Sequence, residues 1–201
     1  MKKGCNPQGL NPEDFFIPVK PKNAVTQEKG MVRLILGGAK SGKSAFALRL
    51  AEAIEGRRAF IATAQPTDDE MADKIKLHKA ERADRWDTFE EPLNIAPLIR
   101  ELATSYSVIL IDCLTLWTSN LLLAGHDFAK EQEALLSSLT GVEASVFVVS
   151  NEVGLGIVPE NRLARQFRNY AGDLNRAVAE VANDVYFITA GIPIKIKEAV
   201  R

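Results

Sequence analysis

The segment Gly37–Ser44 could hold the phosphates of a nucleoside triphosphate. It reads Gly-Gly-Ala-Lys-Ser-Gly-Lys-Ser and fits the pattern G-x-x-x-x-G-K-[ST], in which backbone N–H groups point at phosphate oxygens. Lys43 would reach the β- and γ-phosphates, and the Ser44 hydroxyl would ligate Mg²⁺. The predicted phosphate loop consists of Gly37, Gly38, Ala39, Lys40, Ser41, Gly42, Lys43 and Ser44. The motif predicts triphosphate binding and leaves the reaction open.

A second candidate for chemistry is Asp112, the carboxylate that ends the apolar run Ser107–Asp112. In phosphate-loop proteins an acid at the end of a core strand lies near Mg²⁺, often through a water molecule. A strand that ends in Asp is common, so the functional interpretation depends on the phosphate loop upstream. With that loop present, we expect Ser44 and Asp112 to hold the metal.

The chain has two histidines and two cysteines. His78 shares a helical face with Met71 and Ile75, at positions i, i+4 and i+7, where a packed core residue is more common than a catalyst. His126 falls in an expected exposed turn. With two histidines and no C-x-x-C motif, a dedicated zinc site is not expected.

The segment Ser150–Pro159 follows a β-prone run and precedes a long helix-prone one, which is where α/β sheets place binding loops. The helix carries four arginines, partly on one face: Arg162, Arg165, Arg168 and Arg176. They could form a solvated, salt-bridging surface or a cluster that binds phosphate through the planar guanidinium fork. The residues alone leave both interpretations open.

A parallel α/β sheet would position these residues. From Met31 onward, β-prone runs alternate with helical segments, and several runs are apolar on consecutive residues, as strands buried on both faces should be. The expected strands are Met31–Leu36, Arg58–Thr63, Ser107–Asp112, Ala144–Ser150 and Asp184–Thr189, with Gly191–Lys197 as a further edge strand. The expected helices are Ser44–Ile54, Asp69–Arg82, Pro97–Ala103, Leu114–Leu123, Phe128–Ser138 and Glu160–Ala182. The alternation predicts a P-loop NTPase-like α/β fold with a mostly parallel, doubly wound sheet.

Composition sets limits on the class of protein. A chain of 201 residues with 46% hydrophobic residues is expected to form one soluble domain, residues 31–201, after an irregular tail, residues 1–30. The formal net charge of −1 provides no general attraction to nucleic acid or anionic membranes. No apolar run is long enough to span a membrane, and no secretory signal is recognisable. The distant cysteines, Cys5 and Cys113, are not expected to pair, which favours a reducing, cytoplasmic setting.

In combination, these motifs resemble the bifunctional adenosylcobinamide kinase / adenosylcobinamide-phosphate guanylyltransferase family of cobalamin assembly. The resemblance covers about residues 31–197. Besides the phosphate loop, the matching stretches are 61–65, 68–71, Lys74-Ile75, His78, Arg82, Trp86, 90–93, 112–115 and 120–122. The most specific ones are Ser150–Gly154, Gly156–Arg162 and Tyr170–Asn175, which a generic phosphate-loop kinase would not share.

The resemblance implies two reactions on one corrinoid. A nucleoside triphosphate, GTP or ATP, first phosphorylates the hydroxyl of the aminopropanol arm of adenosylcobinamide. GTP then donates GMP to that phosphate through a GMP–histidine intermediate, and the matching histidine is His78. Imidazole suits this step because it is largely neutral at physiological pH and can attack phosphorus. The resemblance also implies Mg²⁺ as cofactor and a homotrimer.

Site residues follow from the same resemblance. The catalytic residues would be His78 and Lys43. The guanine nucleotide would also contact Ala62, Thr63, Ala64, Lys79, Ala80, Glu81, Arg82, Glu90 and Asp112. The corrinoid would contact Asn151, Glu152, Arg162 and Arg165.

Three positions depart from the family pattern. Lys40 stands where arginine is usual, Leu77 precedes His78 where some members have a second histidine, and Asp112 replaces the Glu of some members. Two other functions remain open. A monofunctional small-molecule kinase would share the phosphate loop but leave Asn151–Arg162 unexplained. A nucleotide-driven switch or assembly ATPase is also conceivable, although the chain has no N-K-x-D guanine signature.

Overall fold

The computed structural model describes residues 30–65 and 85–199 of the chain. Of the expected tail 1–30, only Gly30 lies within the described residues. The expected helix Asp69–Arg82 lies outside them.

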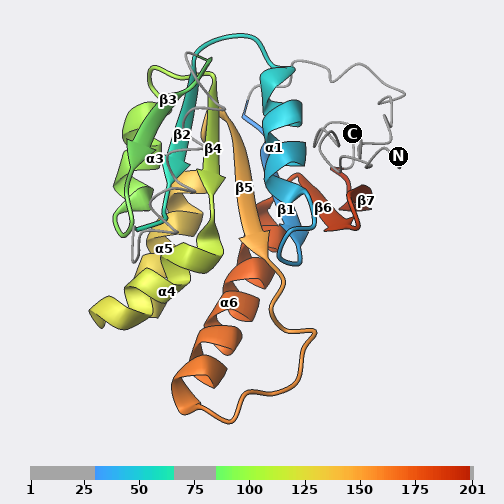
Figure 1. Cartoon of the computed structure of the whole chain (residues 1–201). Coiled ribbons are helices and arrows are strands. Elements are labelled where there is room, and N and C mark those ends of the chain that lie inside the picture. The colour runs from blue at the N-terminus through green and yellow to red at the C-terminus, as the bar shows by residue number, and fades with distance from the viewer. Residues whose placement is uncertain (1–29, 66–84, 200–201) are drawn as a thin grey trace, which may run out of the picture.

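The described residues form a seven-stranded sheet with the order β3-β2-β4-β5-β1-β6-β7 (Figure 1). The strands are β1 Val32–Gly37, β2 Arg58–Ala62, β3 Asp87–Glu90, β4 Val108–Asp112, β5 Ser145–Asn151, β6 Asp184–Thr189 and β7 Ile192–Lys197. Each neighbouring pair is parallel except β6 and β7, which are antiparallel. The predicted parallel α/β fold is confirmed.

Helices cover both faces of the sheet, and each face has its own core. The helices are α1 Lys43–Glu52, α3 Ile95–Leu102, α4 Leu114–Ala124, α5 Phe128–Leu139 and α6 Arg162–Val181. Helix α1 packs Phe46 and Ala47 against one face, whereas α3, α4, α5 and α6 pack on the other, as Figure 1 shows. Alternate strand residues divide between the two cores, with Leu34 in one and Ile35 in the other. The consecutive apolar residues of the strands reflect this burial on both faces.

Strand β3 is not among the strands expected from the sequence. Its residues, Asp-Thr-Phe-Glu, include a single apolar side chain and carry a charge at each end, so they lack the apolar run that marks the central strands. The strand forms at the sheet edge because β2 offers its backbone, with Ala59 opposite Asp87 and Ala62 opposite Glu90. At an edge, one face suffices for burial, and Phe89 packs against the core there.

The boundaries of the other described helices and strands all agree with the prediction to within two residues. Helix α3 begins at Ile95, before the expected start at Pro97, because a proline in the first helical turn needs no N–H partner. The edge strand β7 is confirmed and follows β6 through a turn in which Ala190 and Gly191 have positive φ angles of 49° and 78°. Within the described ranges, no helix has both the length and the apolar character needed to cross a membrane.

Candidate active site

The predicted phosphate loop connects the end of β1 to the start of α1. Gly42 adopts the left-handed conformation with φ 93° directly before the helix, and Lys40 has φ 56°. Gly37 is packed so closely that a Cβ atom there would lie 2.5 Å from the carbonyl oxygen of Ile188 and 2.6 Å from Ser41 Oγ. These positions explain why the loop needs glycine at both ends.

Lys43 is buried at the first position of α1, and its Nζ donates a hydrogen bond to the carbonyl oxygen of Gly38 at 2.9 Å. Burial lowers the pKa of this lysine below its ordinary value, while the nearby Asp112 carboxylate, and then Cys113, partly oppose that shift. A desolvated ammonium group at the start of a helix is well placed to attract phosphate, because the anion would compensate for the lost hydration.

Asp112 ends β4, and β5 lies between β4 and β1. Two strand spacings therefore separate the end of β4 from the phosphate loop, which amounts to roughly 10 Å. At this separation a metal ion bound to phosphates could lie between Ser44 and Asp112, with water completing its ligands. Asp112 thus lies at the same edge of the sheet as the predicted phosphate loop.

Three predicted nucleotide-site residues lie at the same level of neighbouring strands. Ala62 of β2 is opposite Glu90 of β3 on one side and opposite Asp112 of β4 on the other. All three end their strands, so the carboxyl edge gathers residues that are far apart in the sequence. Beyond them, Glu91 N–H donates to the Ala62 carbonyl at 3.0 Å and extends the β2–β3 pairing.

Thr63 is fully buried, and its side chain contacts the backbone of Cys113. Its hydroxyl is therefore engaged in holding the end of β4 rather than facing open space. Ala64 follows at the edge of the described segment and is half-buried.

Asn120, which belongs to one of the stretches that match the family, connects two loops of the site. Its Nδ2 donates to the Thr63 carbonyl at 2.9 Å and to the Pro92 carbonyl at 3.0 Å. Trp117, one turn earlier on α4, donates from Nε1 to the Leu93 carbonyl at 2.7 Å. A polar residue within the apolar run of α4 was the signal that could have identified this role.

Asn151 and Glu152 lie beside the phosphate loop. Asn151 is opposite Gly37 in the β1–β5 register, and Glu152 N–H donates to the Gly37 carbonyl at 3.1 Å. Thr115 accepts a hydrogen bond from Asn151 N–H at 2.6 Å, and Asn175 Nδ2 donates to the Asn151 carbonyl at 3.0 Å. The segment that leaves β5 is therefore tied to the phosphate loop, α4 and α6.

The arginines of α6 have different surroundings. Arg165 donates to the carbonyl oxygens of Pro159 and Glu160, so its guanidinium shapes the loop before the helix. Arg176 forms an exposed ion pair with Asp173 at 3.6 Å. Arg162, the first residue of α6, is exposed beside the N-cap Asn161.

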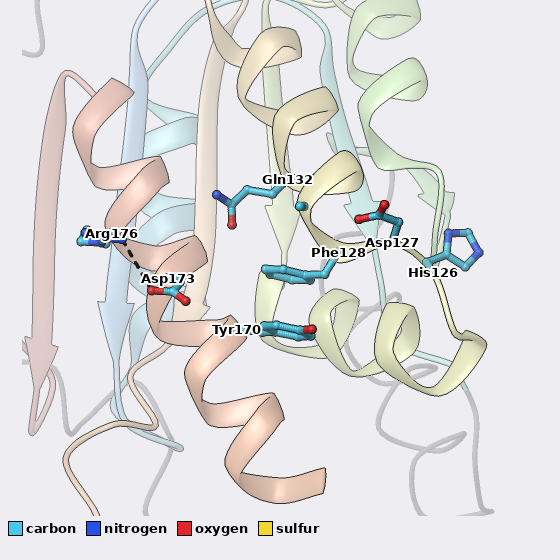
Figure 2. A pocket seen from close by; sticks show the side chains of 8 residues that line it. His126, Asp127, Phe128, Gln132, Tyr170, Asp173 and Arg176 are labelled. Carbon is cyan, nitrogen blue, oxygen red and sulfur yellow. Dashed lines mark ion pairs between the residues drawn. The ribbon is translucent and has the colours of Figure 1, made fainter. Parts of the chain in front are cut away.

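His78 lies outside the described residues, as do Lys79, Ala80, Glu81 and Arg82. The other histidine, His126, is 3.0 Å from Glu131 Oε1 through Nδ1 and lines a pocket of about 490 Å³ between α5 and α6 (Figure 2). In that pocket, the rings of Phe128 and Tyr170 stack with centroids 4.2 Å apart. Arg176 is the one candidate phosphate-binding arginine among the residues that line it, and none of the described residues predicted for catalysis, the nucleotide or the corrinoid lines it.

With this geometry established, comparison with known proteins identifies the family. A family model described as cobinamide kinase / cobinamide phosphate guanyltransferase matches residues 33–196. The chain belongs to this family. It is therefore a member of an enzyme family of kinases and guanylyltransferases, as the motifs indicated.

Individual relatives support the assignment. The chain is 45% identical over 166 residues to the bifunctional adenosylcobalamin biosynthesis protein CobP of Pseudomonas aeruginosa, covering 82% of this chain and 96% of that protein. It is 40% identical over 185 residues to the bifunctional adenosylcobalamin biosynthesis protein CobU of Escherichia coli, covering 83% of this chain and all of that protein.

The solved structure of the flagellar accessory protein FlaH from Methanocaldococcus jannaschii is similar in fold. It has a TM-score of 0.52 and 13% sequence identity, and the match covers 86% of this chain and 80% of FlaH. At this identity the similarity concerns the fold alone.

Proposed function

We propose that this enzyme carries out two successive transfers on one corrinoid substrate. In the first, GTP or ATP phosphorylates the hydroxyl of the aminopropanol arm of adenosylcobinamide. In the second, GTP donates GMP to that phosphate, giving adenosylcobinamide-GDP and pyrophosphate. The observation that supports this most is a buried Lys43 in a phosphate loop that shares the carboxyl edge of the sheet with Asp112, in a chain of this family.

In the kinase step, the amides of the phosphate loop and Lys43 hold the phosphates. Ser44 and Asp112 are the residues that would hold Mg²⁺, since both supply the oxygen ligands that this ion prefers. When bound, the ion neutralises charge that develops on the phosphate oxygens. Asp112 also keeps Lys43 protonated over a wider pH range, because its carboxylate raises the pKa of the ammonium group.

In the guanylyl step, His78 is the nucleophile. A nitrogen of its neutral imidazole attacks the α-phosphorus of GTP, an N–P bond forms, and the bond from the α-phosphorus to the pyrophosphate oxygen breaks. A phosphate oxygen of the phosphorylated corrinoid then attacks the same phosphorus, and the imidazole leaves with its electron pair. The guanine nucleotide contacts the stretch Lys79–Arg82, with Ala62, Thr63, Ala64 and Glu90 lining the same site.

The corrinoid lies on the side of the phosphate loop occupied by Asn151 and Glu152, with Arg162 and Arg165 further along the chain. By resemblance to its family, the enzyme acts as a homotrimer in the cytoplasm. Sedimentation of the purified protein would measure the assembly directly.

The experiment that tests this function uses GTP labelled at the α-phosphate. The wild-type protein should retain an acid-labile, base-stable label and release it when phosphorylated adenosylcobinamide is added. His78→Ala should retain none. Because the chain has two histidines, His126→Ala is a matched control and should label normally. An undiminished label on His78→Ala, or none on the wild type while a γ-label is transferred, would leave a monofunctional kinase as the better assignment.

A further inference from the structure

An apolar groove lies between the second half of α4 and the first turns of α6. It has a volume of about 330 Å³ and is lined by Ser119, Leu122, Leu123, Asn161, Leu163, Ala164 and Phe167. Leu123 is 74% exposed and Leu163 is 47% exposed. Large apolar side chains gathered in a hollow mark a binding surface more often than scattered ones do.

Both walls of the groove are connected along the chain to residues of the predicted phosphate site. Helix α4 begins directly after Asp112 and Cys113, and a rise of 1.5 Å per residue places Leu123 about 14 Å along the helix from its first residue. The other wall follows the segment that leaves β5 at Asn151, next to Gly37, and reaches the groove at Asn161. Figure 1 shows α4 and the start of α6 extending beyond the carboxyl edge of the sheet.

The segment between these points adds apolar surface. Leu155 is 82% exposed, Ile157 is 96% exposed and Val158 is 57% exposed. Arg165 holds the end of this segment through the carbonyl oxygens of Pro159 and Glu160. The exposed apolar residues therefore belong to a segment that is anchored at the phosphate loop at one end and at α6 at the other.

The chemistry of a cobinamide fits this arrangement. Its hydroxyl sits on a short arm, whereas the corrin macrocycle is much bulkier, with methyl groups on its faces and amides at its rim. When the hydroxyl reaches the phosphate site, the macrocycle must lie beyond the carboxyl edge of the sheet. A groove of about 330 Å³ is too small for the whole ring but can hold one edge of it, with Ser119 and Asn161 near the rim amides.

We infer that this groove between α4 and α6 binds one edge of the corrin macrocycle, through the methyl groups there, and so directs its arm at the phosphate loop. The inference rests on the proposed function and assigns a surface for the corrinoid that the candidate polar residues Asn151 and Glu152 do not supply. Burial of Leu123 and Leu163 against the ring provides affinity, and the polar groups provide orientation.

The test replaces both leucines by a polar residue of similar size, Leu123→Gln with Leu163→Gln. The KM for adenosylcobinamide in the kinase step should rise about tenfold or more, because losing apolar contact at two side chains removes at least one factor of ten in affinity. The KM for the nucleotide should not change. Leu123→Met with Leu163→Met keeps the apolar contact and should retain the wild-type KM.

Ile194→Gln is the matched control, because Ile194 is also 47% exposed but lies on β7, away from the groove. Binding of adenosylcobinamide can also be measured directly, without nucleotide, through its visible absorbance. The wild type, the Met double variant and Ile194→Gln should bind it with similar affinity, and the Gln double variant should bind it more weakly. Thermal unfolding establishes that the variants are folded.

The outcomes separate the inference from the function on which it rests. If the wild type transfers phosphate to adenosylcobinamide and the Gln double variant keeps its KM, the groove is not the corrinoid surface and the proposed function stands. If the double variant instead changes the sedimenting mass at unchanged KM, the groove is a subunit contact and the inference is wrong. If the wild type transfers neither phosphate nor GMP to the corrinoid, both fail together.

Discussion

Thr63 and Cys113 are 50 residues apart in the sequence and are joined by two reciprocal hydrogen bonds. Thr63 Oγ1 donates to the Cys113 carbonyl at 2.8 Å and accepts from Cys113 N–H at 2.8 Å. Thr63 N–H also donates to the Asp112 carbonyl at 3.2 Å. The end of β2 thus holds the backbone on both sides of the Asp112–Cys113 junction, and with it the position of the Asp112 carboxylate.

Thr63→Val should therefore reduce both stability and activity. Valine has nearly the same shape but leaves the buried Cys113 N–H without its partner, whereas the Cys113 carbonyl keeps the hydrogen bond from Trp117 N–H. The expected cost is about 1–3 kcal/mol in the free energy of unfolding. Urea unfolding measures this loss. Thr63→Ser keeps the hydroxyl and should recover most of it, whereas equal losses in both variants would show that the methyl group matters instead.

Gly37→Ala and Gly38→Ala should differ in stability although they are neighbours. The new methyl at position 37 would meet the Ile188 carbonyl oxygen at 2.5 Å, and the one at position 38 has no described atom within 4 Å. We expect Gly37→Ala to lose about 1–3 kcal/mol of unfolding free energy through overpacking. Gly38→Ala should stay within about 0.5 kcal/mol of the wild type. Thermal or urea unfolding compares the two, and similar values would contradict the packing seen at Gly37.

The titration of Lys43 should respond to Asp112. Burial lowers the pKa of Lys43 and the Asp112 carboxylate raises it, so Asp112→Asn should move this pKa further down. NMR titration of the lysine side-chain signals measures the change, with Asp87→Asn on the exposed edge strand as control. A Lys43 pKa that does not fall in Asp112→Asn would show that the two groups are not coupled.

The lowered pKa of Lys43 also determines how this residue changes the stability of the protein with pH. Because folding makes Lys43 give up its proton more easily, the buried ammonium opposes folding at pH values below its folded pKa. That penalty is relieved as the pH rises from the folded pKa toward the ordinary value of 10.5. Lys43→Met should consequently stabilise the protein at neutral pH while abolishing phosphate transfer, which unfolding and activity measurements check separately.

Cys113 should make the folded protein sensitive to alkaline pH. Burial, with a smaller contribution from Asp112, raises the pKa of this thiol from 9.0 to about 11. The folded state holds the proton that the unfolded state releases, so the contribution is complete below pH 9.0 and is lost as the pH rises toward 11. The loss is at most about 1.4 kcal/mol per pH unit.

The measurement compares the free energy of unfolding of the wild type and Cys113→Ala between pH 8 and pH 11. Taking the difference removes the contributions of other groups that titrate there, such as Tyr106 and Tyr186. The two curves should converge as the pH rises, and parallel curves would contradict the raised thiol pKa.

Much of the fold was predictable because it depends on residues that are near one another in the chain. The central strands carry apolar residues in succession, and Gly42 and Lys43 define where the loop ends and α1 begins. Strand β3 was not predictable in this way, since its charged ends resemble a loop and only the exposed edge of β2 makes it a strand. Periodicity records which faces are buried, but it does not record which strand will be the neighbour.

The same division applies to the candidate site. The sequence by itself determined which groups are available: a phosphate loop, an acid after a core strand, and a combination of motifs that indicates one enzyme family. Only the tertiary structure decided that β5 separates Gly37 from Asp112, that the Thr63 hydroxyl binds the backbone of Cys113, and that α4 and α6 enclose an apolar groove. These relationships join residues tens of positions apart, and they depend on strand order and helix packing, which arise from the whole chain burying its apolar surface at once.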